Sequence, residues 1–325
     1  SDYLLDTAKG HIEGKISISE AQRRIQNYYE ERSERLEVQA ETMEADIVSA
    51  RIAMLLGERT FQFSPVELLT IHRRLFEGVF EHAGRIRPYN ISKREWVLKG
   101  DSVIYAACDS IKDTLEYDFY TEKQFSYEGL SLQESVKHLA KFTSDIWQIH
   151  PFCEGNTRTT AVFVIKYMKT FGLEVSNDVF AEHSWYFRNA LVRANYNNLK
   201  NGIHATTEYL ELFFSNLLLN TNYELKNRFI HVDYESKLET GNIQSEMKNV
   251  LKGKNFTLNF TLEELAILRL IAADPAITQK EIAVKIGKSD RTVKNKMAML
   301  QDKQYIRRMN GKRNGRWEIL VELPS

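Results

Sequence analysis

Five short segments of this chain carry the residue pattern that begins an α-helix, and this feature constrains the fold most. Each has Ser or Thr followed three residues later by Glu, at residues 17–20, 64–67, 131–134, 261–264 and 278–281. In such a capping box the hydroxyl accepts a hydrogen bond from a free N–H of the first helical turn, and the Glu side chain reaches back to the N–H of the capping residue. The five boxes therefore predict a mostly helical protein.

One segment breaks the helical pattern. Residues 90–106 hold apolar side chains on both sides of Lys99-Gly100-Asp101. Apolar runs that flank a short turn containing glycine are typical of a β-hairpin. We expect one β-hairpin inside an otherwise helical domain.

Length and composition indicate the domain organisation. The chain has 325 residues, of which 43% are hydrophobic, enough for two globular domains of about 150 residues each. Residues 221–256 are polar with little periodicity, which indicates a connector that could contain short helices. We therefore expect an N-terminal helical segment at 1–60, a first domain at 61–220, the connector at 221–256 and a second domain at 257–325.

Charge and cysteine content bound the environment. Lys plus Arg and Asp plus Glu number 44 each, so the net charge of the whole chain says nothing about partners. Two cysteines, Cys108 and Cys153, are too few for a disulfide framework, which indicates a reducing compartment. No secretory pattern opens the sequence, and no run reaches the ~18 apolar residues of a membrane span. We expect a cytoplasmic protein without a membrane partner, and whether it forms a homo-oligomer stays open.

The most reactive groups of the chain share one turn between two expected helices, near its middle. His150 can exchange a proton near neutral pH. The first turn of the following helix has unpaired N–H groups and the positive end of the helix dipole, which attract anions. Gly155 lets a phosphate approach, Asn156 can bind phosphate oxygens or fix the loop, and the fork of Arg158 fits a phosphate. Glu154 beside a phosphate needs a cation between them, which suggests Mg²⁺.

Each of these residues has a simpler explanation when taken alone. A single histidine is more often a core residue with satisfied hydrogen bonds, and Gly-Asn is usually a plain turn. The complete spacing, His-x-Phe-x-Glu-Gly-Asn-x-Arg from His150 to Arg158, is much harder to explain in this way.

This spacing resembles the signature of the Fic domain family, His-x-Phe-x-Asp/Glu-Gly-Asn-x-Arg-x-x-Arg. The resemblance covers residues 61–219 and includes the segment GRIRPYNISK at the expected hairpin. It implies a mostly α-helical domain with a β-hairpin flap over the site. It also implies transfer of AMP from ATP to a hydroxyl of a protein side chain, with release of pyrophosphate.

The resemblance also implies roles for single residues. His150 would deprotonate the target hydroxyl, Glu154 would hold Mg²⁺, and Phe152 would anchor the loop in the core. The residues implied to bind the nucleotide are Gly155, Asn156, Thr157 and Arg158 at the phosphates, and Tyr186, Asn195 and Tyr196 at the base. The alternative for the aromatic residues around Tyr186 is a place in the core.

Two departures from the family pattern concern the donor and its control. Ala161 replaces the second motif Arg, and the lost charge-assisted contact would be worth ~1.5–3 kcal/mol. ATP would then bind more weakly, or another nucleotide or phosphodiester would be the donor. The family's inhibitory pattern, Ser/Thr-x-x-x-Glu-Gly/Asn, has no match, and residues 42–46 are only a degenerate candidate. Residues 10–37 resemble the tail of small antitoxins, with a helix packed on the domain as the simpler alternative.

A second compact pattern follows Thr261. Three expected helices at 261–272, 278–286 and 289–301 precede two Asn-Gly turns that suit strands, and this order resembles a winged helix-turn-helix domain. Residues 276–317 contain twelve Lys and Arg against three acidic residues, a net charge of +9 that suits duplex DNA. The third helix would enter a major groove. The predicted DNA-binding residues are Arg291, Lys294, Asn295, Lys296 and, on the wing, Lys312 and Arg313. The alternative is a module used only for protein contacts.

Together these patterns predict a Fic-type protein adenylyltransferase that uses ATP and Mg²⁺, acts on an unknown target protein or on itself, and carries a DNA-binding module. The alternative is a DNA-binding transcriptional regulator whose Fic domain senses a nucleotide or peptide without turnover. Ala161 favours the regulator, whereas intact His150 and Glu154 favour the enzyme. A kinase-like Fic relative is disfavoured by Gly155.

Overall fold

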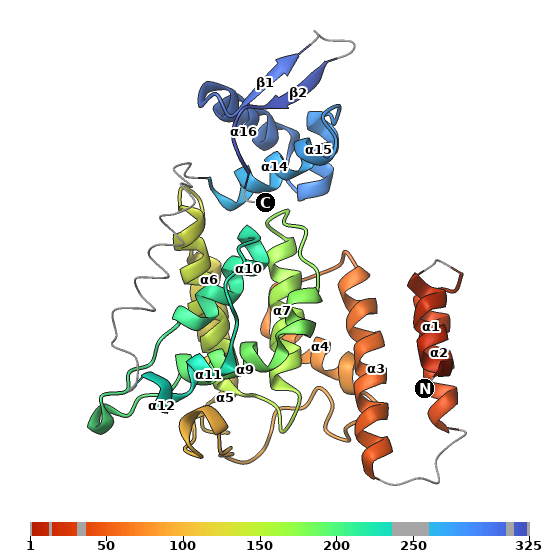
Figure 1. Cartoon of the computed structure of the whole chain (residues 1–325), viewed down its shortest axis with the longest axis vertical. Helices are drawn as coiled ribbons and strands as arrows, with labels where there is room; N and C mark the ends of the chain where they lie inside the picture. The colour runs from red at the N-terminus through yellow and green to blue at the C-terminus, as the bar shows by residue number, and fades with distance from the viewer. Residues whose placement is uncertain (1, 13–14, 31–36, 236–259, 310–314, 324–325) are drawn as a thin grey trace.

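A computed structural model of the chain describes residues 2–12, 15–30, 37–235, 260–309 and 315–323. The described residues are mostly helical (Figure 1). The α-helices are α1 (Asp2–Ile12), α2 (Ile18–Glu30), α3 (Glu37–Gly57), α4 (Pro65–Phe76), α5 (Ile111–Gln124), α6 (Leu132–Ile149), α7 (Asn156–Lys169), α8 (Asp178–Glu182), α9 (Ser184–Ala194), α10 (Glu208–Leu219), α11 (Asn227–Ile230), α12 (Val232–Glu235), α14 (Leu262–Ala273), α15 (Gln279–Ile286) and α16 (Asp290–Asp302). Two 3₁₀ turns, η1 (Trp96–Leu98) and η2 (Leu199–Asn201), and two strands, β1 (Ile306–Met309) and β2 (Arg316–Ile319), complete the order.

The five predicted capping boxes all begin helices. Both hydrogen bonds of the box are present at Ser131, Thr261 and Thr278. Ser64 and Ser17 each accept the N–H of the residue three positions later. The prediction of a mostly helical protein is therefore confirmed, and its local signal marks where α2, α4, α6, α14 and α15 start.

Helices α6 and α7 form the centre of the larger domain. Helix α7 packs on α4 and α6, α6 also packs on α5 and α10, and α9 packs on α10. The core side of α6 is buried as a continuous row, and its members include Val136, Leu139, Phe142, Ile146 and Trp147. Because α6 and α7 are both held along their length, the short turn between them has fixed ends. None of the described helices is long and apolar enough to cross a membrane.

Helix α3 is attached to α7 by hydrogen bonds from lysine side chains to the carbonyls at its C-terminus. The ammonium of Lys166 on α7 is buried and donates to the carbonyl of Leu55 at 2.8 Å, and Lys169 donates to Leu56 at 2.8 Å. Positive side chains at a helix C-terminus stabilise the free carbonyls and the helix dipole. Arg51 of α3 in turn donates to the carbonyl of Leu75 in the last turn of α4 and to that of Glu77, which follows α4. Helix α2, from the segment with antitoxin-like sequence, packs on α3.

The β-hairpin predicted at residues 90–106 is not formed as paired strands. In the described part of the chain the one sheet is that of β1 and β2, and this segment, here called the flap, is a loop around η1. The N–H of Glu95 does donate to the carbonyl of Asp101 at 2.9 Å, which closes the turn. The hydroxyls of Ser92 and Ser102 also meet across the two arms at 3.0 Å, but the ladder of backbone hydrogen bonds is not continued. An isolated two-stranded pair has little stability of its own.

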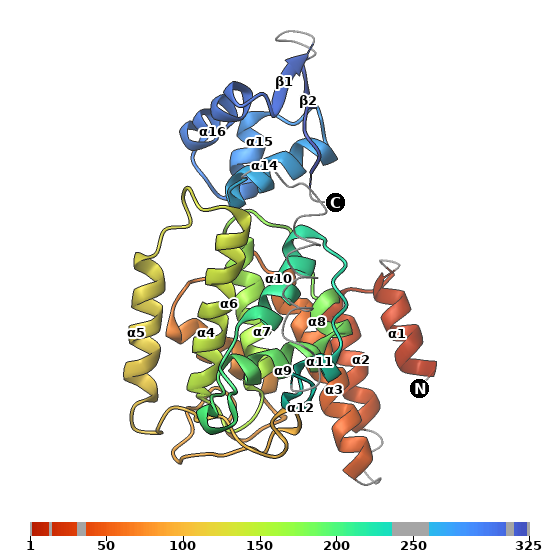
Figure 2. The ribbon, with the colours of Figure 1, turned by 60° about the vertical axis from the view of Figure 1, so that its left-hand side comes forward.

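The winged helix-turn-helix prediction is confirmed. Helices α14, α15 and α16 precede the antiparallel pair of β1 and β2, in which Ile306 lies opposite Ile319 and Arg308 opposite Trp317. This domain sits at the end of the helical body where α7 ends, as two views show (Figures 1 and 2). Arg269 of α14 donates to the carbonyl of Leu218 at the end of α10, at 2.8 Å.

Candidate active site and nucleic-acid interface

The turn between α6 and α7 is bounded by two residues in the left-handed backbone region. His150 ends α6 with φ 50°, and Gly155 precedes α7 with φ 79°. The buried guanidinium of Arg87 fixes the first of these ends, because its Nε donates to the carbonyl of His150 at 2.8 Å. A second Arg87 nitrogen donates to the carbonyl of Ala106 at 2.5 Å, which ties the turn to the end of the flap.

The side chain of Asn156 fixes the loop from within. Its Oδ1 accepts the N–H of Phe152 at 3.0 Å, and its Nδ2 donates to the carbonyl of Phe152 at 2.8 Å. Of the two roles that the sequence leaves open for Asn156, the structure shows this one. Phe152 is buried in the core and stacks on the ring of His72, with centroids 3.7 Å apart.

His72 on α4 holds the second half of the loop. Its Nδ1 accepts the N–H of Gly84 at 2.8 Å, so its Nε2 carries the proton and donates to the carbonyl of Glu154 at 3.0 Å. Burial lowers the pKa of His72 from 6.5 to about 4. The ring is therefore neutral and acts as a spacer between α4 and the loop.

His150 is placed as a neutral base. It is 4% exposed, and its Nδ1 lies 3.3 Å from the carbonyl of Trp147, which can only accept. This contact assigns the proton to Nδ1 and leaves Nε2 as the acceptor. The ring packs on Tyr105, with centroids 4.1 Å apart. Burial, helped by the charge of Lys93, lowers the pKa of His150 from 6.5 to about 3.

The start of α7 keeps the features of an anion site. It has no side-chain cap and no acidic residue in its first turn. A Cβ at Gly155 would lie 2.4 Å from the ring of Phe76, so glycine is needed there for packing as well as for approach. Thr157 accepts a hydrogen bond from Trp147 Nε1 at 3.0 Å. The guanidinium of Arg158 lies over the Phe76 ring, 4.8 Å from its centroid.

Arg158 is already paired with an acidic residue of α3. One of its terminal nitrogens lies 2.5 Å from Oε1 of Glu44. Glu44 belongs to residues 42–46, the degenerate candidate for an inhibitory segment, although the contact is to the first motif Arg. Ala161, which replaces the second motif Arg, packs partly buried against the core.

Glu154 faces solvent beside the flap. Its carboxylate is 58% exposed, and Lys93 Nζ lies 3.0 Å from each of its oxygens. In the described residues no group of three or more His, Cys, Asp or Glu is arranged to hold a metal ion. Mg²⁺ can bind through one carboxylate when phosphates and water complete its octahedron. The carboxylate of Glu154 could in this way hold a Mg²⁺ ion together with the phosphates of a nucleotide.

The flap is anchored on α9 and the residues after it. Arg188 forms a two-pronged ion pair with the buried carboxylate of Glu95, at 2.6 and 3.0 Å. The hydroxyl of Tyr196 donates to the Asp101 carboxylate at the flap turn, at 2.6 Å. Tyr196 was predicted at a base pocket, and the structure shows it holding the flap.

The other two predicted base-pocket residues are engaged inside the helical body. Asn195 donates to the hydroxyl and the carbonyl of Ser144 on α6, at 2.9 and 3.2 Å. Tyr186 is only 2% exposed and belongs to the core, so it has no open ring face for a purine. Its neighbour Trp185 is exposed instead.

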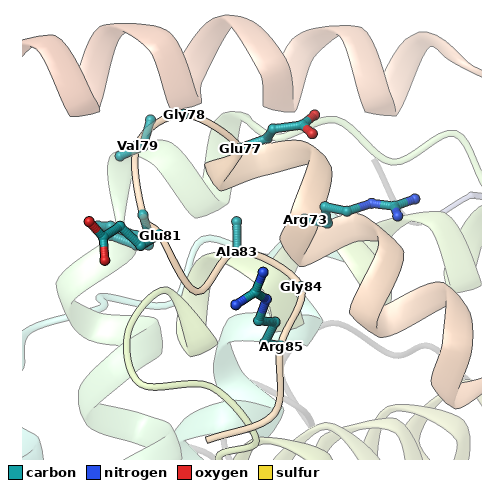
Figure 3. A pocket seen from close by; sticks show the side chains of 9 residues that line it. Arg73, Glu77, Gly78, Val79, Glu81, Ala83, Gly84 and Arg85 are labelled. Carbon is teal, nitrogen blue, oxygen red and sulfur yellow. The ribbon is translucent and has the colours of Figure 1, made fainter.

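A cleft of about 610 Å³ opens after α4, among residues 73–85. Figure 3 shows its lining, with the carboxylates of Glu77 and Glu81 directed outward on opposite sides. The rings of Phe80 and Phe76 stack between this cleft and Gly155. Two Arg and two Glu line it, so its charge is balanced and does not favour a phosphate.

Helix α16 of the second domain has an exposed face. Arg291, Lys294 and Asn295 are exposed on one side of it, and their contact with DNA stays a prediction. Lys296 needs correction: its side chain is 12% exposed and lies 3.6 Å from Glu263 and 3.7 Å from Glu128 of the larger domain. Lys312 and Arg313 lie outside the described residues.

The net charge of +9 overstates the free positive surface. Acidic residues outside the counted segment neutralise part of it, because Glu263 also pairs with Lys288 at 2.9 Å and Glu264 with Lys303 at 2.6 Å. Exposed positive side chains remain on α15 and α16 and also on the strands, where Arg308 and Arg316 are exposed.

The sequence analysis gave no role to Arg87, His72 or Lys93, and it named Glu44 only within the degenerate candidate at residues 42–46. All four residues act across long sequence separations. The one available signal was the segment GRIRPYNISK, which contains Arg87 and Lys93 and was noted only for its place at the flap.

Comparisons with known proteins agree with both domains. Residues 62–168 match the family model described as Fic/DOC family, and residues 264–307 match that of winged helix-turn-helix DNA-binding. A protein adenylyltransferase of Bartonella henselae is 25% identical over 195 residues, which are 55% of this chain and 36% of that relative. The match thus spans about a third of the length of the relative.

Two solved structures show weaker likeness. BepC of Bartonella tribocorum with bound AMPPNP has a TM-score of 0.45 and 21% identity, over 55% of this chain and 86% of that one. A Fic family protein from Desulfovibrio desulfuricans G20 has a TM-score of 0.36 and 13% identity, over 99% and 97% of the two chains. The sequence matches show a Fic/DOC-family domain at residues 62–168 of this chain and a winged helix-turn-helix domain at residues 264–307.

Proposed function

We propose that this protein transfers AMP from ATP to a hydroxyl group of a protein side chain. The observation that carries the proposal is the turn between α6 and α7, which joins a neutral histidine base to an uncapped helix start with Arg158. The similarity to a protein adenylyltransferase supports the same chemistry.

In the proposed reaction the phosphates of ATP lie at the first turn of α7. Its free N–H groups and the helix dipole stabilise their negative charge, and Arg158 adds a charged fork once it leaves Glu44. Glu154 would hold Mg²⁺ together with the phosphates, and the ion would supply positive charge against the phosphate oxygens.

The transfer step uses Nε2 of His150. The target hydroxyl oxygen attacks the α-phosphorus while its proton passes to Nε2, and the bond from that phosphorus to the β-phosphate oxygen breaks to release pyrophosphate. A base with a pKa of about 3 is weak near pH 7. The negative charge of bound triphosphate opposes the nearby cations and raises this pKa toward a useful value.

The test is transfer of label from α-labelled ATP to protein in the presence of Mg²⁺. His150→Ala should lower the rate by ~10²–10⁴ while ATP binding is retained, because the phosphate site consists of the helix start and Arg158. Ser135→Ala on the same helix, away from the loop, is the control. Binding of ATP without transfer by the wild-type chain would instead favour a regulator that senses nucleotide.

A second proposed function is DNA binding by α16. The observation in favour is the exposed face of Arg291, Lys294 and Asn295 on a helix of the matched winged-helix model. Fluorescence titration of the full chain with duplex DNA should show log K falling by about 0.9 per neutralised phosphate as log salt rises. Arg291→Ala or Asn295→Ala should change the preferred sequence. Absence of duplex binding at ~50 mM salt would leave the domain as a protein-contact module.

A further inference from the structure

Lys93 of the flap contacts the loop that carries the predicted site residues. Its ammonium bridges both oxygens of Glu154, and it is also the charge that most lowers the pKa of His150. A single positive charge thus faces both the predicted metal ligand and the predicted base. No residue role implied by the family resemblance includes Lys93.

We propose that Lys93 is a donor-binding residue that exchanges partners. It pairs with Glu154 while that carboxylate holds no cation, and it moves to the phosphates of the donor when Mg²⁺ takes the carboxylate. This inference rests on the proposed nucleotide transfer.

Electrostatics favour such an exchange. One carboxylate cannot fully neutralise both an ammonium and a divalent ion, so arrival of Mg²⁺ at Glu154 leaves Lys93 without its counter-charge. A triphosphate beside the same carboxylate brings several negative charges. A lysine is suited to the move because its charge is compact and its stem is flexible.

Among the described residues of the motif loop and its surroundings, the other cations named as phosphate candidates are missing or engaged. Ala161 removes the second motif Arg, and Arg158 is held by Glu44. Arg87 is buried and directs its nitrogens to backbone carbonyls. The side chain of Lys93 is 27% exposed, and so it can change its conformation without disturbing the packing of the core.

The flap backbone can stay in place during the exchange. Its turn is held by Arg188 through Glu95 and by Tyr196 through Asp101. Only the side chain of Lys93 has to move, which distinguishes this device from closure of a whole loop.

A competing explanation gives Lys93 only the task of neutralising Glu154. The two explanations predict opposite effects of removing the charge. If Lys93 binds the donor, Lys93→Met weakens binding of ATP with Mg²⁺. If Lys93 is only a counter-ion, the same change leaves that binding equal or makes it tighter, because Mg²⁺ no longer has to displace an ammonium.

The experiment is isothermal titration of the full chain with ATP, in Mg²⁺ and in EDTA. In Mg²⁺, Lys93→Met should weaken binding about tenfold or more, as expected for a charge-assisted contact, and Lys93→Arg should recover most of the loss. Lys99→Met is the matched control, because Lys99 is also a flap lysine but pairs with Asp233 at 2.7 Å. Thermal unfolding of each variant checks that the fold is retained.

A double change tests the exchange itself. In EDTA, Glu154→Gln should tighten ATP binding in the wild-type chain, because it removes a repulsive charge and releases Lys93 to the phosphates. In the Lys93→Met background the gain should be clearly smaller. Equal gains in both backgrounds, or unchanged or tighter ATP binding by Lys93→Met in Mg²⁺, would overturn the inference alone. A wild-type chain that binds no ATP in either buffer would overturn the proposed function together with it.

Discussion

Removing the charge of Glu44 should increase the affinity of the protein for ATP. Glu44 of α3 lies 2.5 Å from a terminal nitrogen of Arg158, the motif arginine expected at the phosphates. A phosphate must displace this carboxylate to use the guanidinium. Glu44→Gln keeps the size of the side chain and removes its charge, so the displacement becomes easier.

The magnitude follows from the exposure of the pair. The side chains of Arg158 and Glu44 are 38% and 27% exposed, and one short contact joins them. Ion pairs of this kind contribute about 0.2–1 kcal/mol. ATP affinity in Glu44→Gln should therefore rise at most about fivefold. Arg158 should stay in place without its partner, because it also lies over the ring of Phe76.

The assay is titration with ATP at low and high salt, and the gain should shrink as salt screens the pair. Glu58→Gln is the matched control, since Glu58 follows α3 and pairs with Arg74 at 2.5 Å outside the motif loop. It should alter stability but not ATP affinity. An unchanged or weaker affinity in Glu44→Gln would refute the reasoning that α3 restrains Arg158.

Two further predictions concern stability and the domain contact. The pKa of His72 is about 4 in the fold and 6.5 as its ordinary value, so the unfolded chain binds the extra proton and stability is lost as pH falls from about 6.5 toward 4. The loss attributable to His72 is up to about 3 kcal/mol, and urea unfolding of His72→Gln across that range should show a correspondingly shallower pH dependence. At Gly172, after α7, a Cβ would lie 2.7 Å from Ile286 of α15, so Gly172→Val should loosen the winged-helix domain. Limited proteolysis between the domains should then become faster, whereas equal cleavage rates would show that the contact carries no stability.

The sequence predicted well where the signal is local. Capping boxes depend on residues three positions apart, and the helix starts at Ser64 and Ser131 followed from them directly. The order of helices and strands in the winged-helix domain was also readable, because Gly287 ends α15 and Ser289 caps α16. The turn from His150 to Arg158 is contiguous in sequence, so its residues needed no knowledge of the fold to be grouped.

The predictions were wrong where a side chain contacts a residue that is far away in the sequence. The flap has the apolar pattern of a β-hairpin, but its two arms do not pair as strands. Glu95 of the flap instead forms an ion pair with Arg188, 93 positions away in the sequence. Lys296 has the positive charge expected of a residue that contacts DNA, but the packing of the two domains places it near Glu128. Tyr186 has the chemistry to stack on a base, and its helix turns it into the core. None of these contacts and none of this burial can be predicted from residue spacing along the sequence.

The ion pair of Glu44 and Arg158 shows how the packing of helices brings together two residues that are far apart in the sequence. Helix α3 is fixed near its C-terminus by Lys166 and Lys169, which come from the last turn of α7. Arg158 comes from the first turn of the same helix, about 12–17 Å away at 1.5 Å per residue. Because both helices are rigid, fixing α3 at one end of α7 places Glu44 at the other. Lys166 and Lys169 lie outside the site, but by fixing α3 they determine that Glu44 is the carboxylate that contacts Arg158.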